Sequence, residues 1–303
     1  MSYVAEEIVS QPDLWLRAAD AAADAAAALP RPGERVAVVG CGTSWFMAMA
    51  YANLREAAGQ GETDAFAGSE FPVTRLPGNQ GQSPMNRPYD RIVAITRSGT
   101  TTEVLDILKT AGARSTVLVG DVDTPAVTLA RDVVALPWAD ERSVVQTRFA
   151  TSALALLRAS LGEDLTAAAA DARRALELPL PLDPAAIEQV TFVGRGWTNG
   201  LAQEAALKCR EAATFWTEAY PAMDFRHGPI SISATGRAVW AFGEVPAGLR
   251  GDVEATGATF VHAPALDPMA HLVTAQRFAV ALAEHKGLDP DAPRHLTRSV
   301  ILP

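Results

Sequence analysis

Residues 92–108 read IVAITRSGTTTEVLDIL, an apolar run followed by a hydroxyl-rich stretch and then by a second segment with periodic apolar residues. The apolar run predicts a buried strand, and the apolar spacing after Glu103 predicts a helix. Five hydroxyl side chains and one glycine lie between them: Thr96, Ser98, Gly99, Thr100, Thr101 and Thr102. A strand that leads directly into a helix is the repeating unit of a parallel α/β sheet.

Short apolar segments recur along the first half of the chain, separated by stretches with helical character. Strands are predicted at 35–39, 91–95, 115–119 and 132–136. Helices are predicted at 13–29, where the alanine-rich run ends at Pro30, at 45–58, and over a long region from about 146 to 177. This alternation predicts a parallel sheet that is covered by helices on both faces.

The second half of the chain repeats this pattern after a linker. Residues 178–184 contain three prolines, which cannot continue a helix. A strand, a glycine turn and a helix follow at 190–193, 194–197 and 199–213, then strands near 238–242 and 257–262 and a helix near 270–286. We therefore predict two α/β modules, residues 1–180 and residues 181–303.

The composition restricts the possible partners. The chain has 303 residues, with 26 basic and 35 acidic side chains and a formal charge of −9. An acidic surface disfavours nucleic acid, because contacts with the phosphate backbone need a basic face. A single anionic ligand is still compatible with this charge, because backbone N–H groups can make a pocket locally positive.

The sequence also indicates a compartment. Two cysteines, Cys41 and Cys209, do not indicate a disulfide framework. The N-terminal residues lack the pattern of a signal peptide, and no apolar run is long enough to cross a bilayer. We expect a cytoplasmic protein without a membrane partner.

Residues 40–44, GCGTS, resemble the start of a dinucleotide fingerprint. Trp45, however, stands where the third glycine of that fingerprint should be, and its large side chain would obstruct the close packing of helix on strand. A dinucleotide cofactor is therefore not expected.

Two turns, at 40–44 and 96–102, each follow a predicted strand and precede a predicted helix. The carboxyl ends of parallel strands open into one crevice, where hydroxyls and first-turn N–H groups can bind a phosphate. The alternative is that these residues are N-caps, which would explain one hydroxyl but not five. Arg97 either adds a charge-assisted contact or faces water.

Several segments resemble the sugar isomerase (SIS) family. They are CGTS at 41–44, SEF at 69–71, TRSGTTTEVL at 96–105, VGRGWTNGLAQEAALKCREAATFWTEAYPAMDFRHGP at 193–229 and PRHLTRSVIL at 293–302. The likeness is to double-SIS proteins such as the isomerase half of glucosamine-6-phosphate synthase, the amino-sugar-phosphate deaminases and the ketose/aldose isomerases. It implies that a sugar phosphate is bound by Thr43, Ser44, Thr96, Arg97, Ser98 and Thr101. Arg97 departs from the synthase pattern, in which a neutral amide is usual.

Glu204, Lys208 and Glu211 share one face of the helix predicted at 199–213. The spacing alone would suit a solvated ion-pair stripe. The resemblance instead implies that Glu211 moves a proton between C1 and C2 of the open-chain sugar, and that Lys208 stabilises the enediolate.

The resemblance implies that His227, in the sequence FRHGP, opens the sugar ring in the partner subunit's site, and hence that the protein is a homodimer. Arg298 stands where the synthase has a lysine that forms an imine. A guanidinium stays protonated and cannot do this. We expect Arg298 to lie over the pocket and to neutralise developing enediolate charge.

The leading interpretation is an enzyme that isomerises a hexosamine 6-phosphate or deaminates it with isomerisation. One alternative is dehydration of an N-acetylhexosamine 6-phosphate by the same base. Another is a sugar-phosphate sensor without catalysis, in which Glu211 and His227 would have no use. No metal site and no cofactor are expected.

Overall fold

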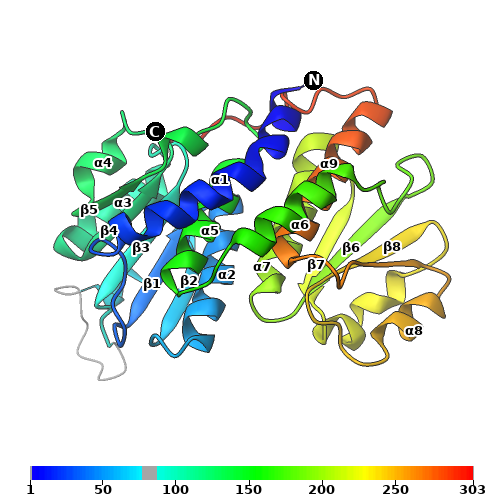
Figure 1. The fold of residues 1–303 in the computed structure, drawn as a ribbon, viewed down its shortest axis with the longest axis horizontal. Coiled ribbons are helices and arrows are strands. Elements are labelled where there is room, and N and C mark those ends of the chain that lie inside the picture. The colour runs from blue at the N-terminus through cyan, green and yellow to red at the C-terminus, as the bar shows by residue number, and fades with distance from the viewer. Residues whose placement is uncertain (1, 77–86, 303) are drawn as a thin grey trace. The chain divides into compact units, whose positions relative to one another are not determined.

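The computed structural model describes residues 2–76 and 87–302 (Figure 1). The chain forms two compact units, each described by itself. The five-strand unit comprises residues 14–141, 148–164 and 297–303, and the four-strand unit comprises residues 1–13, 142–147 and 165–296. None of the described helices is both long enough and apolar enough to cross a membrane.

The sheet of the five-strand unit has the strand order β2-β1-β3-β4-β5, with every neighbouring pair parallel. Its strands are β1 Val36–Gly40, β2 Thr63–Ala67, β3 Arg91–Thr96, β4 Ser115–Val119 and β5 Asp132–Ala135. The helices of this part of the chain are α2 Thr43–Ala57, α3 Thr102–Ala111, α4 Pro125–Leu129 and α5 Arg148–Ser160. Helix α1, Tyr3–Ala25, contributes residues to both units.

The sheet of the four-strand unit has the order β7-β6-β8-β9, again with parallel neighbours. The strands are β6 Gln189–Gly194, β7 Thr217–Pro221, β8 Arg237–Phe242 and β9 Thr259–His262. The helices are α6 Thr166–Glu177, α7 Thr198–Ala213, α8 Leu249–Glu254 and α9 Pro268–His285, and a short 3₁₀ helix, η5, covers Asp224–His227.

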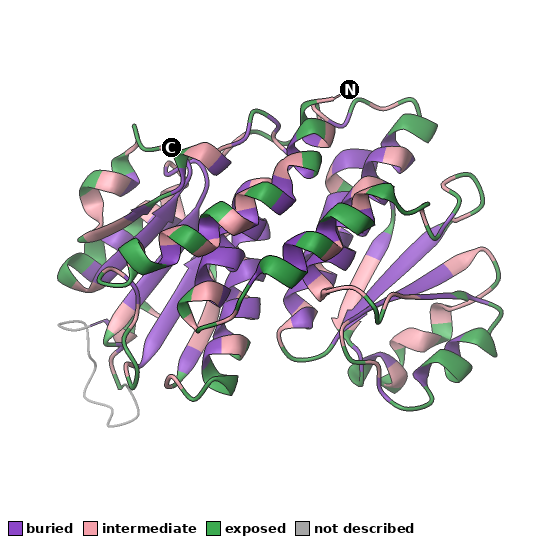
Figure 2. Ribbon diagram, in the orientation of Figure 1, coloured by how far each residue is buried: buried purple, intermediate pink, exposed green. Residues whose placement is uncertain are grey.

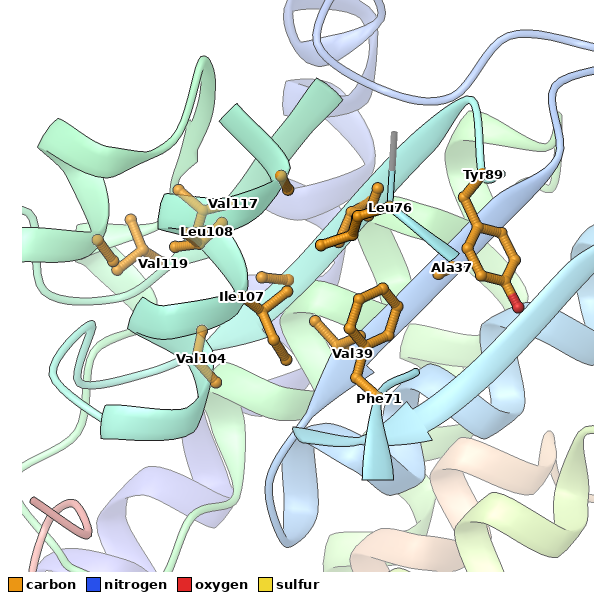
Figure 3. Close-up of a cluster of buried hydrophobic side chains, with 14 residues drawn as sticks. Ala37, Val39, Phe71, Leu76, Tyr89, Val104, Ile107, Leu108, Val117 and Val119 are labelled. Carbon is orange, nitrogen blue, oxygen red and sulfur yellow. The ribbon is translucent and has the colours of Figure 1, made fainter. Parts of the chain in front are cut away.

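The central strands β1, β3, β4, β6 and β8 are almost wholly buried (Figure 2). In the five-strand unit, alternate residues of β1, β3 and β4 pack against the apolar side of α3, where Val104, Ile107 and Leu108 lie (Figure 3). Phe71 and Tyr89 complete this core. Since strands that are buried on both faces need apolar residues at every position, these are the strands whose sequences read as continuous apolar runs.

The predicted fold class is confirmed: both sheets are parallel and flanked by helices. Strands β2 and β7 were missed because both are half-buried edge strands with mixed polarity, TDAFA and TEAYP. The expected helix at 13–29 in fact begins at Tyr3, because Val4, Ile8 and Trp15 are buried along one face. The expected helical region at 146–177 is two helices that end and restart around Gly162.

The predicted modules 1–180 and 181–303 each contain one sheet. The compact units differ from these modules in where they place the helices and the chain ends. Helix α6 precedes residue 181 but packs with α9 in the four-strand unit, and residues 297–303 belong to the five-strand unit. The order of strands along the sequence therefore does not determine which helix covers which sheet.

Candidate active site

The two predicted phosphate turns lie at the carboxyl ends of two neighbouring strands in the five-strand sheet. Strands β1 and β3 are parallel neighbours in the register Val39↔Ala94, so the segments after Gly40 and Thr96 leave the sheet side by side. Five of the six predicted phosphate residues are at most 5% exposed, and Thr101, at the N-cap of α3, is half-buried. The buried ones are Thr43, Ser44, Thr96, Arg97 and Ser98.

Residues 96–102, which we call the hydroxyl turn, do not use their side chains as helix caps. The N-cap residues of α2 and α3 are Gly42 and Thr101, and neither helix has a capping bond from a side chain. Instead, Thr96 Oγ1 accepts a bond from Gly99 N at 3.2 Å, and Ser98 Oγ accepts one from Thr100 N at 3.4 Å. In these bonds both hydroxyls are acceptors, so each keeps its own proton to donate.

Glycines allow the close approach of backbone segments at the carboxyl ends of these strands. A Cβ on Gly40 would lie 2.5 Å from the backbone carbon of Ser44, so only glycine lets α2 begin this close to β1. Gly99 has φ +62°, and a Cβ there would lie 2.0 Å from Thr124 Oγ1. The hydroxyl turn therefore depends on glycine for both its conformation and its space.

Arg97 is directed at protein oxygens. Its side chain is 1% exposed, its Nη1 lies 4.0 Å from Glu141 Oε2, and its Nη2 donates to the Arg298 carbonyl oxygen at 3.1 Å. The alternative that Arg97 faces water is wrong, because the side chain is buried. Its contact with a phosphate stays a prediction.

Residues 297–302, which we call the tail, lie along the hydroxyl turn. Thr100 Oγ1 donates to Ser299 Oγ at 2.9 Å, Thr102 N donates to the Val300 carbonyl at 3.2 Å, and Leu302 N donates to Thr102 Oγ1 at 2.9 Å. The tail thus pairs with Thr100 of the hydroxyl turn and with Thr102, the first residue of α3, through these three hydrogen bonds.

Arg298 forms an ion pair in which one guanidinium nitrogen contacts both carboxylate oxygens of Asp140. Its Nη2 lies 2.6 Å from Oδ1 and 2.7 Å from Oδ2, and its Nη1 donates to the carbonyl of Glu141. A second carboxylate, that of Asp121, lies 3.9 Å away. The charge of Arg298 is therefore already balanced by carboxylates of its own unit.

The second group of predicted residues lies on α7 in the four-strand unit. Glu204 and Lys208 are 0% and 1% exposed, and the Glu211 side chain is 18% exposed. Lys208 Nζ lies 3.5 Å from Glu204 Oε1 and 2.5 Å from Glu211 Oε2. The interpretation as a solvated stripe is wrong, because two of the three charges have no contact with water.

This group, which we call the charge triad, is costly to bury. Desolvating an ion costs several kcal/mol, about as much as its pairing returns. Lys208 and Glu211 nevertheless keep a charge-assisted bond with one carboxylate partly open to solvent. A partly shielded carboxylate can take a proton from a bound carbon acid, and a neighbouring ammonium group can stabilise the negative charge that results.

His227 is the last residue of η5 and is exposed. Gly228 follows it with φ +136°, a conformation that glycine adopts readily and other residues rarely. The structure therefore presents His227 at a sharp turn on the surface of the four-strand unit. A role toward a second copy of the chain stays a prediction.

Neither cysteine is suited to nucleophilic chemistry. Both are free, as the sequence predicts. Burial raises the pKa of the Cys209 thiol to about 12, and burial together with the nearby Glu103 carboxylate raises the pKa of Cys41. Over residues 2–76 and 87–302, no cluster of three or more His, Cys, Asp or Glu side chains could hold a metal ion.

Sequence reasoning missed the buried polar residues at 141–147. Glu141, Ser143 and Thr147 are at most 2% exposed, and Val145 and Thr147 line a small cavity together with Lys208. Glu7 supports this segment by accepting a bond from Arg142 N at 2.6 Å. In the sequence, ADERSVVQT resembles an ordinary charged loop, so no pattern distinguished these residues from a solvated connection.

No protein-family model matches the sequence. The chain is 22% identical to a glucosamine-6-phosphate deaminase from Thermotoga maritima, with a TM-score of 0.83 over 99% of this chain and all of that chain. It is 17% identical to a tagatose-6-phosphate ketose/aldose isomerase from Escherichia coli, with a TM-score of 0.76 over 100% and 97% of the two chains. The chain has the double-SIS fold of phosphosugar isomerases.

Curated proteins are similar in sequence as well. The glutamine–fructose-6-phosphate aminotransferase (isomerizing) of Caulobacter vibrioides is 28% identical, over 88% of this chain and 52% of that protein. The enzyme of the same name from Thermotoga maritima is 26% identical, over 90% of this chain and 52% of that protein. The chain spans about half the length of these relatives.

Proposed function

We propose that the chain is an enzyme that isomerises a hexosamine 6-phosphate or deaminates it with isomerisation. The observation that supports this most is the charge triad, in which Lys208 Nζ lies 2.5 Å from Glu211 Oε2 in an otherwise buried cluster. Because burying such a pair is costly, its presence is typical of a site that stabilises negative charge during a reaction. The double-SIS fold raises the expectation that the substrate is a phosphosugar.

In the proposed reaction, the hydroxyl turn and the N-terminus of α3 bind the phosphate. Thr96 and Ser98 each keep a hydroxyl proton to donate, and the positive end of the helix dipole favours an anion. Thr43 and Ser44, at the start of α2, supply donors from the neighbouring strand end.

Glu211 acts as the base. The C2–H bond of the open-chain aldehyde breaks, the proton passes to the Glu211 carboxylate, and the electron pair forms an enediolate-type intermediate near Lys208. Return of the proton to C1, together with transfer of one proton from the C2 oxygen or nitrogen to the C1 oxygen, gives the 2-ketose or, from a 2-amino sugar, its imine. Water then hydrolyses the imine to the ketone and releases ammonia, so no oxidant or reductant is needed.

Arg298 takes no covalent part in this scheme. A guanidinium remains protonated and is not nucleophilic. Its ion pair with Asp140 also leaves no uncompensated positive charge to place on an enediolate. The expected role of Arg298 as a neutralising group is therefore not retained.

His227 is proposed to open the sugar ring in a second copy of the chain, which makes the active species a homodimer. The support is its exposure on a glycine-shaped turn, together with the FRHGP motif. Mixing inactive His227→Ala and Glu211→Gln subunits should restore part of the activity after exchange. No recovery despite demonstrated exchange would contradict this assignment.

The test of the function is incubation with glucosamine 6-phosphate, fructose 6-phosphate and N-acetylglucosamine 6-phosphate. Products are measured by mass spectrometry and by a coupled ammonia assay. Glu211→Gln should lower kcat by about 10²–10⁴-fold, the usual contribution of a general base. The matched control Glu188→Gln, an exposed carboxylate of the same unit, should keep wild-type kcat.

Each mass change identifies one reaction. Loss of ammonia indicates deamination, no mass change with a new ketose indicates isomerisation, and loss of water indicates dehydration. No turnover of any substrate by wild-type protein, or equal rates for Glu211→Gln and wild type, would refute the proposal.

A further inference from the structure

We propose that Arg298 is a positioning residue: its ion pair with Asp140 holds the tail on the hydroxyl turn and thereby keeps the turn in its phosphate-binding conformation. This inference rests on the proposed function for the identity of the ligand. It concerns only the five-strand unit, in which all the residues involved lie.

The ion pair fixes the tail at one residue. Both Asp140 oxygens lie within 2.7 Å of Arg298 Nη2, and Nη1 bonds to the Glu141 carbonyl, so the guanidinium has three protein acceptors. A planar guanidinium held at several points restricts its own backbone more than a single point charge does. The position of residue 298 is thus determined by side-chain contacts.

Residue 298 contacts the turn through its own carbonyl group and the side chain of Arg97. The Arg298 carbonyl accepts a bond from the buried Arg97 Nη2, and Arg97 is itself part of the hydroxyl turn. The Arg97 carbonyl in turn accepts bonds from Gly120 N and Asp121 N, at 3.2 and 2.9 Å, at the end of β4. The turn is held both by the sheet and by the tail.

The tail also determines which groups of the turn remain for a ligand. It occupies the Thr102 N–H and engages the hydroxyls of Thr100 and Thr102. The donors of Thr96 and Ser98 are not engaged by these tail contacts. Releasing the tail would leave Thr100 and Thr102 free to rotate and would loosen the first turn of α3, so an anion would meet a less ordered set of donors.

The experiment compares Arg298→Ala and Asp140→Asn with two controls that remove the same charges at exposed positions, Arg294→Ala and Asp123→Asn. Hydrogen exchange of peptides covering residues 96–104 should be roughly three- to ten-fold faster in the two variants, as expected for loss of a well-aligned, partly exposed ion pair. Both controls should exchange like wild type. Arg298→Lys, which keeps one contact with Asp140, should fall between the two groups.

Binding and kinetics test whether this order serves the phosphate. The dissociation constants for inorganic phosphate and glucosamine 6-phosphate, and the KM for the substrate turned over, should rise about three- to ten-fold while kcat stays within about two-fold. A purely structural role would lower the melting temperature without this division between KM and kcat.

Two results would overturn the inference: unchanged exchange at residues 96–104 in Arg298→Ala, or faster exchange with unchanged phosphate affinity. Failure of the proposed function is a distinct outcome. In that case wild-type protein turns over no hexose phosphate, whereas the exchange and inorganic-phosphate measurements still show whether Arg298 orders an anion-binding turn.

Discussion

The start of α2 and the start of α7 are two copies of one backbone unit with different chemistry. Each follows a strand that ends in glycine, Gly40 or Gly194, and in each the residue four positions later has a hydroxyl, Ser44 or Thr198. A Cβ on Gly40 would lie 2.5 Å from the backbone of Ser44, and one on Gly194 would lie 2.2 Å from that of Thr198, so in both units the helix begins too close to its strand for any side chain.

The hydroxyl in the four-strand unit is already used. Thr198 Oγ1 accepts a bond from Arg195 N at 3.0 Å and lies within bonding distance of the carbonyls of Arg195 and Phe242. The five-strand unit instead presents two strand ends rich in hydroxyls. The polar residues that α7 buries lie along the body of the helix, as Glu204 and Lys208, whereas the body of α2 buries mainly apolar side chains. The same fold element thus provides donors at the helix N-terminus in one unit and buried charges in the other.

The largest expected effect tests the buried charges. Lys208→Met removes the cation within 3.5 Å of two carboxylates, one of them 0% exposed. We expect a loss of about 3–5 kcal/mol in the free energy of unfolding, as for other buried pairs that lose one partner. Met47→Leu, an apolar exchange on α2, should cost less than about 1.5 kcal/mol.

Urea unfolding at pH 7 measures both variants. Adding Glu204→Gln to Lys208→Met should recover part of the loss, because it removes the deepest carboxylate. Equal unfolding free energies for Lys208→Met and Met47→Leu would show that the triad is less buried in solution than in the structure.

The next effect tests the donors of the five-strand unit. Ser98→Ala combined with Thr101→Ala should weaken sugar-phosphate binding by ten-fold or more per site, because a hydrogen bond to a charged group contributes about 1.5–3 kcal/mol. Thr110→Ala, an exposed hydroxyl near the other end of α3, is the control. Isothermal titration with glucosamine 6-phosphate measures all three, and wild-type affinity in the double variant would rule out the hydroxyl turn as the phosphate site.

A third effect tests the shared glycine. Gly40→Ala and Gly194→Ala should each lower stability by about 1–3 kcal/mol because the added methyl overlaps backbone atoms. Gly194→Ala should be worse, since its nearest contact is 2.2 Å rather than 2.5 Å. Gly251→Ala in α8 meets nothing within 4 Å and should stabilise by about 0.4–1 kcal/mol. Urea unfolding should rank the stabilities as Gly194→Ala below Gly40→Ala, and both below wild type and Gly251→Ala. A different order would show that the two helix starts are not packed against their strands in the same way.

The smallest effect concerns pH and the core of the four-strand unit. Burial lowers the pKa of His271 to about 3 from its ordinary value of 6.5, and the neutral ring accepts a bond from Trp240 Nε1 at 2.8 Å. Between these two values the unfolded chain binds a proton that the native ring does not. The native state is therefore fully favoured above pH 6.5 and loses stability as the pH falls.

At pH 5 the free energy of unfolding should be about 2 kcal/mol lower than at pH 7, because protonation of the unfolded ring favours unfolding by about 1.4 kcal/mol for each step of one in pH below 6.5. His271→Gln keeps an acceptor for Trp240 but does not titrate, so its unfolding free energy should depend less on pH over this range. Parallel pH profiles for the variant and wild type would contradict the assignment.

The sequence predicted most of the fold because the parallel strands are buried on both faces. Such strands must be continuously apolar in their interior, as VAVVG at 36–40 and IVAI at 92–95 are. The edge strands β2 and β7 are not so constrained, and their sequences mix polar and apolar residues. The sequence also did not show which unit contains α6, because α6 joins the four-strand unit by packing against α9, about 100 residues further along the chain.

At the candidate site, residue types and spacing predicted the hydroxyl turn and the face that Glu204, Lys208 and Glu211 share. They did not show that Lys208 is buried, that Arg97 points to Glu141, or that Arg298 pairs with Asp140. Each of these depends on contacts between residues more than 40 positions apart or on depth below the surface. A periodic pattern carries neither kind of information.

The tail completes a unit whose strands all precede residue 136. During synthesis on the ribosome, the five-strand sheet can be made long before residues 297–302 emerge, and the four-strand unit is made in between. A chain that is synthesised at roughly 5–20 residues per second leaves the hydroxyl turn uncovered for about ten seconds or more. Until residues 297–302 have been made, the turn lacks the contacts that the tail supplies, although every strand of its own sheet has already been synthesised.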